Sequence, residues 1–232
     1  MKPPHSDEGL TTAPAPDDAP ANAQTHDIAP APRAGRKRSY HHGDLADALA
    51  AAARVIIERD GPANLSLSKC CRMAGVSTAA PYKHFSGKDE LLRRLVMDGF
   101  EELGARMREA RDDCPGPLAD RITAMGMSYI EFALANPGMF RLVFGMTKEM
   151  HDPQDLEMED CGQSCFQVLI DEAARAVPPD AGEEAAKGLA IMLWTFVHGA
   201  ASLALDGNYD AAKKDVDLRR MVAMATASLL PA

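Results

Sequence analysis

The sequence predicts an all-α fold, with a small N-terminal head of three short helices and a larger helical C-terminal domain. From Asp44 onward, apolar residues recur every three or four positions, a spacing that places them on one face of an α-helix. Prolines close to glycine or asparagine interrupt this pattern at Gly61-Pro62, at Cys114–Pro117 and at Asn136-Pro137, and a helix is expected to end at each break. No segment alternates strictly between apolar and polar residues, as a half-buried strand does.

The first 35 residues differ from the rest of the chain. They hold seven prolines and eight alanines without an apolar period, so they cannot bury enough surface to offset the entropy of ordering. We expect a disordered tail. The basic cluster Arg36–Arg38 follows, and it is either the solvated end of a linker or an arm that touches phosphates or the minor groove. The chain is therefore divided into a tail (1–35), a head (36–94) and a C-terminal helical domain (95–232).

The head is expected to begin with a helix from Asp44 to the break at Gly61-Pro62. One face of this helix carries Leu45, Leu49, Ala52 and Ile56. The head ends where Ser86–Glu90 starts a long connecting helix, which has acidic residues in its first turn and runs to about Asp112.

Between these two helices, residues 65–85 predict a helix-turn-helix. Ser66 is placed to cap a first short helix, and Gly75 is placed to make the turn after it. Ser77 is placed to cap a second short helix, in which Pro81 ends the first turn, where a missing backbone N–H costs little. A helix, a glycine turn and a second helix with an aromatic and basic tip are how a helix-turn-helix presents side chains to a DNA groove.

The charge of the chain is unevenly distributed. The whole chain carries a net charge of −9, which by itself argues against a nucleic-acid partner. Residues 36–94, however, contain 11 basic and 6 acidic residues, for a net charge of +5, whereas residues 95–232 contain 12 basic and 23 acidic residues. The positive charge therefore lies on the head, where it favours double-stranded DNA as a partner.

The second short helix is expected to enter the major groove. Thr78 and Ala79 at its start are placed to meet base edges or a thymine methyl group. Tyr82, Lys83 and His84 suit phosphates, which position a protein without specifying sequence. The remaining candidates for DNA contacts come from the same helix and its two neighbours, and they are Ser77, Ser66, Lys69 and Lys88. Phe85 is assigned to the core of the head.

The C-terminal domain is expected to contain five helices. Their predicted ranges are 118–136, 137–145, 153–176, 181–205 and 215–230. The fourth carries Leu189, Leu193 and Val197 on one face and Trp194 and His198 on another, so we expect it to be buried on two sides. Together with the last helix it has more apolar surface than one subunit covers, which indicates a homodimer.

Composition and motifs limit the cellular compartment and the classes of function that the chain can have. No run approaches the ~18 apolar residues that a membrane span needs, and the N-terminus has no signal-peptide pattern. Five cysteines without a disulfide-scaffold spacing fit a reducing compartment, so we expect a cytoplasmic protein with no membrane contact. Gly162-Gln163-Ser164 is a poor nucleophile elbow, because Phe166 replaces the second glycine and no strand precedes it. Without a phosphate-binding glycine loop or a zinc-protease helix, we expect no enzyme, no cofactor and no metal site.

Two groups of motifs resemble a known family. In the head, these are Tyr40-His41-His42-Gly43-Asp44-Leu45, Ala74-Gly75-Val76-Ser77 and Ala80-Pro81-Tyr82-Lys83-His84-Phe85. They are similar to the DNA-binding domain of the tetracycline-repressor-type (TetR) family of transcriptional regulators. In the C-terminal half, Asn136–Phe144 and Trp194–Gly199 resemble the branch of that family named for its Trp-His-Gly motif.

This resemblance implies a homodimer that binds a palindromic operator and releases it when a small molecule enters the C-terminal ligand-binding and dimerisation domain. Repression rather than activation rests on the resemblance alone, and apart from it only the apolar richness of the domain supports a ligand site. The candidates for ligand contacts are six aromatic residues, Phe132, Phe140, Phe144, Phe166, Trp194 and His198. For any one of them, ordinary core packing is the simpler interpretation.

The cysteines depart from the family pattern. Cys70-Cys71 stands where relatives usually carry small aliphatic residues, and we interpret the pair as small hydrophobes in the core of the head. Cys161 and Cys165 lie one helical turn apart and, with His151, suggest a metal site or an oxidant sensor, although the spacing is not a common zinc pattern. The alternative function is therefore a small-molecule, thiol-sensing or metal-sensing protein with a weak or vestigial DNA-binding head. The basic charge of residues 36–94 argues against that alternative.

Overall fold

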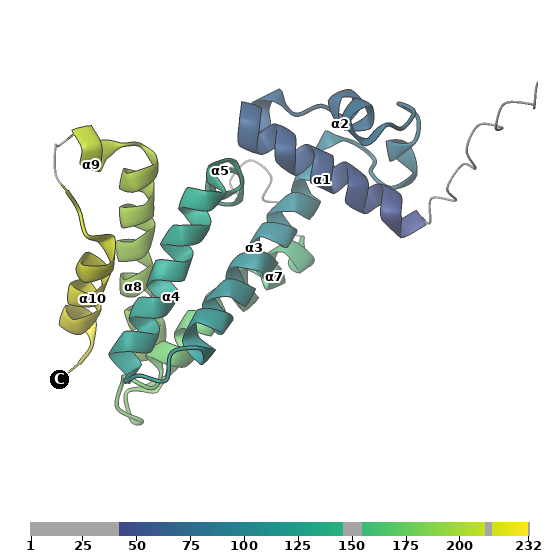
Figure 1. Ribbon diagram of the computed structural model, residues 1–232. Helices are drawn as coiled ribbons and strands as arrows, with labels where there is room; N and C mark the ends of the chain where they lie inside the picture. Colours follow the sequence, from purple (N-terminus) through teal and green to yellow (C-terminus); the bar gives the residue numbers. More distant parts are fainter. Residues whose placement is uncertain (1–41, 146–154, 212–214, 232) are drawn as a thin grey trace, which may run out of the picture. The chain divides into compact units, whose positions relative to one another are not determined.

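The computed structural model of the chain describes residues 42–145, 155–211 and 215–231 (Figure 1). All regular secondary structure within these ranges is helical, which confirms the all-α fold class. The predicted tail, the cluster Arg36–Arg38 and His151 lie outside the described residues.

The described part of the head contains two α-helices and two single turns of 3-10 helix. They are α1 (His42–Asp60), η1 (Pro62–Asn64), α2 (Leu67–Ala74) and η2 (Pro81–Lys83). The Ser66 hydroxyl accepts a hydrogen bond from the backbone N–H of Lys69 at 3.3 Å, and Gly75 ends α2 in the left-handed conformation with φ of 69°. The predicted cap and turn are therefore confirmed, because a helix start needs an acceptor and a positive φ favours glycine.

The second helix of the predicted helix-turn-helix is shorter than expected. Residues 78–80 form a turn, closed by the Ala80 N–H donating to the Ser77 carbonyl at 3.0 Å, and only η2 winds further. The prediction that Ser77 caps a helix is wrong, since Ala80 occupies the cap position of η2 and makes no side-chain cap. Pro81 is the cause. In an α-helix capped by Ser77, the N–H of residue 81 makes the first bond to the Ser77 carbonyl, and proline has no N–H.

The C-terminal domain begins on the long helix that leaves the head. The helices are α3 (Lys88–Asp112), α4 (Leu118–Ala135), α5 (Pro137–Gly145), α7 (Leu156–Ala173), α8 (Gly182–Leu205), α9 (Asn208–Ala211) and α10 (Leu218–Leu229). Their ends agree with the predicted ranges to within three residues, and α5 has the predicted bounds. The single turn of α9 was not predicted.

Two hydrophobic cores share α3. Near its start, Leu91 packs with α1 and α2 in the core of the head, and further along Leu103 packs with α4, α7 and α8. Short α5 also contributes to both cores, with Met139 in the first and Phe140 in the second. α3 and α5, together with Met158 of α7, therefore connect the core of the head to the C-terminal domain.

Within the described ranges one helix, α8, is long and apolar enough to cross a membrane, with a mean hydropathy of 1.6 over its most apolar window. The sequence expectation differed because it required an uninterrupted apolar run, which Thr195, His198 and Ser202 break. In the structure α8 packs against α4, α7 and α10, as the core helix of a globular domain does. Length and composition of one such helix are weak grounds for a membrane span.

Candidate functional site

The tip of the head, residues 77–84, carries most of the predicted DNA contacts. Ser77, Thr78, Ala79 and Lys83 are all exposed, and Tyr82 exposes 65% of its surface. Lys83 makes no ion pair with any residue that the structure describes. The tip thus offers hydroxyl, methyl, phenol and ammonium groups to solvent.

The last residue of the tip, His84, and Phe85 after it are partly or largely buried. His84 is half-buried, and Phe85 is 5% exposed and packs in the core of the head. The assignment of Phe85 to the core is therefore confirmed, and His84 is less exposed than its neighbours Tyr82 and Lys83.

Lys69 and Lys88 have a structural role that the sequence did not reveal. The Lys69 ammonium donates to the Asn64 carbonyl at 2.9 Å, and the Lys88 ammonium donates to the Ala63 carbonyl at 3.4 Å. Both therefore hold η1 in place. An ammonium group has three N–H donors, so each lysine keeps donors for a phosphate. Ser66 is half-buried and its hydroxyl is already engaged as the cap of α2.

The Cys70-Cys71 pair lies inside the head. The two side chains are 0% and 1% exposed, and burial raises the pKa of the Cys70 thiol to about 11. Buried thiols behave as small hydrophobes, so the packing interpretation of this pair is confirmed.

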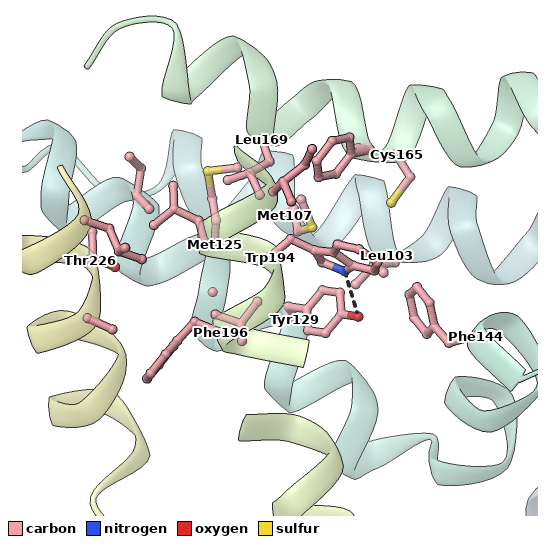
Figure 2. Close-up of a pocket in the computed structure, with 18 of the residues that line it drawn as sticks. Leu103, Met107, Met125, Tyr129, Phe144, Cys165, Leu169, Trp194, Phe196 and Thr226 are labelled. Carbon is pink, nitrogen blue, oxygen red and sulfur yellow. Dashed lines mark hydrogen bonds between the residues drawn. The ribbon is translucent and has the colours of Figure 1, made fainter. Parts of the chain in front are cut away.

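A cavity of about 380 Å³ lies in the C-terminal domain, between α3, α4, α5, α7, α8 and α10 (Figure 2). Of the six predicted ligand contacts, Phe144, Phe166 and Trp194 line it. Phe132 is fully buried in the core and does not line the cavity, and the same is true of the largely buried Phe140. A cavity of this volume is within the range of small-molecule sites.

The polar centre of the cavity is a residue that the sequence did not single out. The Tyr129 hydroxyl lies 2.8 Å from Nδ1 of His198. It also accepts a longer hydrogen bond of 3.3 Å from the Trp194 indole N–H (Figure 2). Burial raises the pKa of Tyr129 and lowers the pKa of His198, so the phenol stays protonated and the imidazole neutral. The two groups therefore share one neutral hydrogen bond, whose donor is set by the tautomer of His198. His198 does not line the cavity itself, and it positions the hydroxyl of Tyr129, which does.

Only the apolar periodicity of α4 pointed to Tyr129, since this residue shares a face with Ile122 and Met125, which also line the cavity. That pattern predicts burial and does not distinguish a cavity wall from solid core.

The thiols of α7 are poorly suited to sensing oxidants. Cys165 lines the cavity at 8% exposure, and burial raises its pKa to about 12. Cys161 is half-buried, donates to the Met97 carbonyl at 3.5 Å, and its pKa is also raised by burial. The reactive thiolate is therefore disfavoured at both. In the described residues no three His, Cys, Asp or Glu side chains form a group that could hold a metal ion.

The head and the cavity wall meet at the start of α5. The Glu58 carboxylate of α1 accepts hydrogen bonds from the backbone N–H groups of Gly138 (2.8 Å) and Met139 (3.0 Å). These N–H groups are unpaired within the helix, and a carboxylate at a helix N-terminus is also favoured by the helix dipole. α1 therefore caps the helix that carries Phe144 into the cavity.

The same junction is tightly packed. A Cβ atom on Gly138 would lie 2.5 Å from the Ile57 carbonyl oxygen and 2.8 Å from the Glu58 Cα. Beside it, the Arg54 guanidinium donates to the Asn136 side-chain oxygen at 2.9 Å and pairs with Glu102 of α3 at 2.6 Å. α1, α3 and the α4–α5 corner are thus joined by hydrogen bonds as well as by close contact.

Two matches with known families decide the identity of the fold. Residues 48–95 match the family described as bacterial regulatory proteins, tetR family, and residues 122–228 match the tetracyclin repressor-like C-terminal domain. The two matches together cover more than half of the chain. The chain belongs to the TetR family of transcriptional regulators. This confirms the predicted family, with its helix-turn-helix DNA-binding domain, and the expectation that the chain is not an enzyme.

Individual TetR-family relatives are distant. An HTH-type transcriptional regulator of Mycobacterium tuberculosis is 29% identical over 125 residues, which are 53% of this chain and 53% of that protein. The chain therefore spans about half the length of the curated relatives it matches. A solved structure of a Rhodococcus protein of unknown function is 30% identical, with a TM-score of 0.70, and the match covers 83% of this chain and 97% of that one. A tetR-family regulatory protein of Rhodococcus shares the fold at 19% identity, with a TM-score of 0.57 over 81% of this chain and 98% of that one.

Proposed function

We propose that this TetR-family regulator binds a palindromic operator as a homodimer, represses transcription there, and is released when a small molecule enters the cavity. In this proposal the head (36–94) reads DNA in the cytoplasm, and residues 95–232 dimerise and sense the ligand. The observation that carries it is the exposed tip at residues 77–83, which stands on the basic segment of an otherwise acidic chain.

The side chains of the tip divide by chemistry. Thr78 and Ala79 offer a hydroxyl and methyl groups, which suit base edges and the thymine methyl group. Tyr82 and Lys83 offer a phenol and an ammonium group that forms no ion pair with any described residue, and both groups suit phosphates. Lys69 and Lys88 add charge at the base of the tip while they hold η1.

A dimer accounts for apolar surface that α8 and α10 leave uncovered. Met192 and Leu203 of α8 and Met224 of α10 expose between 45% and 61% of their surface. On the same helix, a Cβ added to Gly188 or Gly199 would meet no atom within 4 Å. An open apolar face of this kind suits the same face of a second copy, and a two-fold dimer reads two inverted half-sites.

The junction at α5 gives the cavity a physical connection to the head. Phe144 lines the cavity and packs edge-to-face on Phe100 of α3, with 5.9 Å between ring centroids. A ligand that displaces Phe144 moves α5, and α5 is tied to α1 through Glu58. The head then turns relative to the C-terminal domain and the spacing between the two half-site readers changes. In this way binding energy in the cavity reduces operator affinity.

The test is selection of genomic DNA fragments by the full chain, followed by binding measurements on the enriched sequence. We expect a palindrome to be enriched and to bind more tightly than its scrambled version. Enrichment of no common sequence would contradict the proposal and favour the alternative, a sensor with a vestigial head. Repeating the selection with a reductant and with a chelator tests that alternative further, because a thiol or metal switch would change the result.

A further inference from the structure

We propose that the ligand of the cavity is an uncharged, mainly apolar molecule of about fifteen non-hydrogen atoms, and that the cavity rejects anions such as carboxylates, sulfonates and phosphates. This inference rests on the proposed function, because it takes the cavity to be the ligand site. It goes further by naming the chemical class of the ligand.

The wall of the cavity supplies no charge. None of the described residues that line it is Asp, Glu, Lys, Arg or His. Its polar side chains are Tyr129, Trp194, Cys165 and Thr226, all of them neutral, since burial raises the pKa of both the tyrosine and the cysteine. A buried anion without a cationic partner is strongly disfavoured, because it loses its hydration and gains no ion pair.

Neither Arg106 nor Arg108 of α3 lines the cavity. Arg106 lies over the buried Phe132 ring, 5.8 Å from its centroid, and pairs with Glu102 at 2.8 Å. Arg108 is exposed on α3 and is not part of the wall, although its charge slightly opposes the rise in the Cys165 pKa. Neither group is placed to accept an anion inside the cavity.

The two strongest hydrogen-bond donors in the wall are engaged with neighbouring side chains. The Trp194 N–H donates to the Tyr129 oxygen, and the Tyr129 hydroxyl shares a hydrogen bond with Nδ1 of His198. An anion needs N–H or O–H donors, and to obtain the Trp194 N–H it would have to break the bond to Tyr129. The centre of the cavity therefore suits a neutral ligand that makes at most one hydrogen bond to Tyr129.

The volume sets the size. An apolar cavity of about 150 Å³ holds one benzene molecule. A cavity of 380 Å³ therefore holds about two and a half times as many atoms, or about fifteen non-hydrogen atoms. This is the size of a two-ring or three-ring aromatic molecule or of a medium-length alkyl chain.

The experiment compares two probes that differ by a single charged group. N-phenyl-1-naphthylamine is neutral and carries one N–H, and 1-anilinonaphthalene-8-sulfonate is the same ring system with a sulfonate. Trp194 is the only tryptophan of the chain and lines the cavity, so energy transfer from it to the probe reports binding at this site. We expect the neutral probe to bind the full chain at least about a hundredfold more tightly. Equal or tighter binding of the sulfonate, or no transfer with either probe, would overturn the inference.

Two variants locate the signal. Gly162 lines the cavity, where an added Cβ meets only the Phe100 ring at 3.7 Å, so Gly162→Leu should fill part of the space and weaken the neutral probe at least about tenfold. The matched control is Gln163→Leu, an exposed neighbour, which should leave binding unchanged. If both variants retain wild-type affinity and fold, the probe is not in the cavity and the inference fails.

A separate measurement distinguishes this inference from the proposed function. The selected operator is titrated with protein in the presence of the neutral probe. A probe that binds the cavity and leaves operator affinity unchanged contradicts ligand-relieved repression, while the preference for neutral molecules stands. A sulfonate that binds the cavity and releases the operator supports ligand-relieved repression and contradicts the preference for neutral molecules.

Discussion

Tyr82 at the tip of the head exposes 65% of its surface, whereas Tyr129 in the cavity wall exposes 4% and has its hydroxyl fixed between Trp194 and His198. The two phenols illustrate two kinds of binding surface. At the tip the polar groups are exposed to water. In the cavity they are paired with one another, and what remains for a ligand is space and apolar surface. Charge and hydrogen bonding are therefore expected to dominate at the tip, and shape and desolvation in the cavity.

In the proposed function the tip and the cavity are coupled through the junction of α1 and α5, so substitutions at this junction test the coupling most directly. We expect Gly138→Ala to lower the free energy of unfolding by about 3 kcal/mol, because the new Cβ would lie 2.5 Å from a backbone oxygen that has no room to move. Denaturant unfolding of the full chain measures this.

Gly145→Ala, at the other end of α5, is the matched control. A Cβ there meets no atom within 4 Å, so the free energy of unfolding should change by no more than about 0.5 kcal/mol. If the two substitutions changed the free energy of unfolding equally, the close approach of α1 and α5 would not be what requires glycine at position 138.

Glu58→Gln tests the contribution of the Glu58 negative charge to the same junction. The amide keeps one acceptor but loses the charge that two backbone N–H groups share at the start of α5, and we expect a loss of about 1 kcal/mol in stability. We also expect the neutral probe to change operator affinity less than in the wild type. Glu131→Gln, on the exposed side of α4, is the control and should alter neither quantity. A variant that is less stable but fully responsive would remove Glu58 from the route between the two regions.

The tip itself is tested by Lys83→Ala. Because this ammonium group is exposed and forms no ion pair among the described residues, its loss should weaken binding to operator and to random DNA about tenfold alike. The slope of log affinity against log salt should fall by about 1. Lys187→Ala, where the ammonium pairs with Glu183 on α8, removes the same charge far from DNA. Affinity loss confined to the operator would mean that Lys83 reads bases.

How much the sequence revealed differs between the two regions for a physical reason. Ser66, Gly75 and Pro137 act on their own few residues, so the cap of α2, the turn after it and the start of α5 were predictable. The helix expected from Ser77 was not found, because the bond that Pro81 removes is the first one of that helix. The apolar faces of α4 and α8 were also predictable, but a cavity is the space left where six helices fail to fill a core, and periodicity does not report it.

The smallest effect is expected from the cavity. Burial lowers the pKa of His198 in the folded chain, so the unfolded chain binds the proton more readily. Stability from the neutral imidazole is complete above the ordinary histidine pKa of about 6.5 and is lost as the pH falls below it. His198→Asn keeps an acceptor for the Tyr129 O–H but does not titrate. The free energy of unfolding should therefore drop less between pH 7.5 and pH 5.5 in the variant than in the wild type, by at most about 1 kcal/mol. Identical pH dependence in the two proteins would mean that the pKa of His198 is the same folded and unfolded. The cavity would then be wetter than its apolar wall indicates, and the contrast with the tip would be weaker.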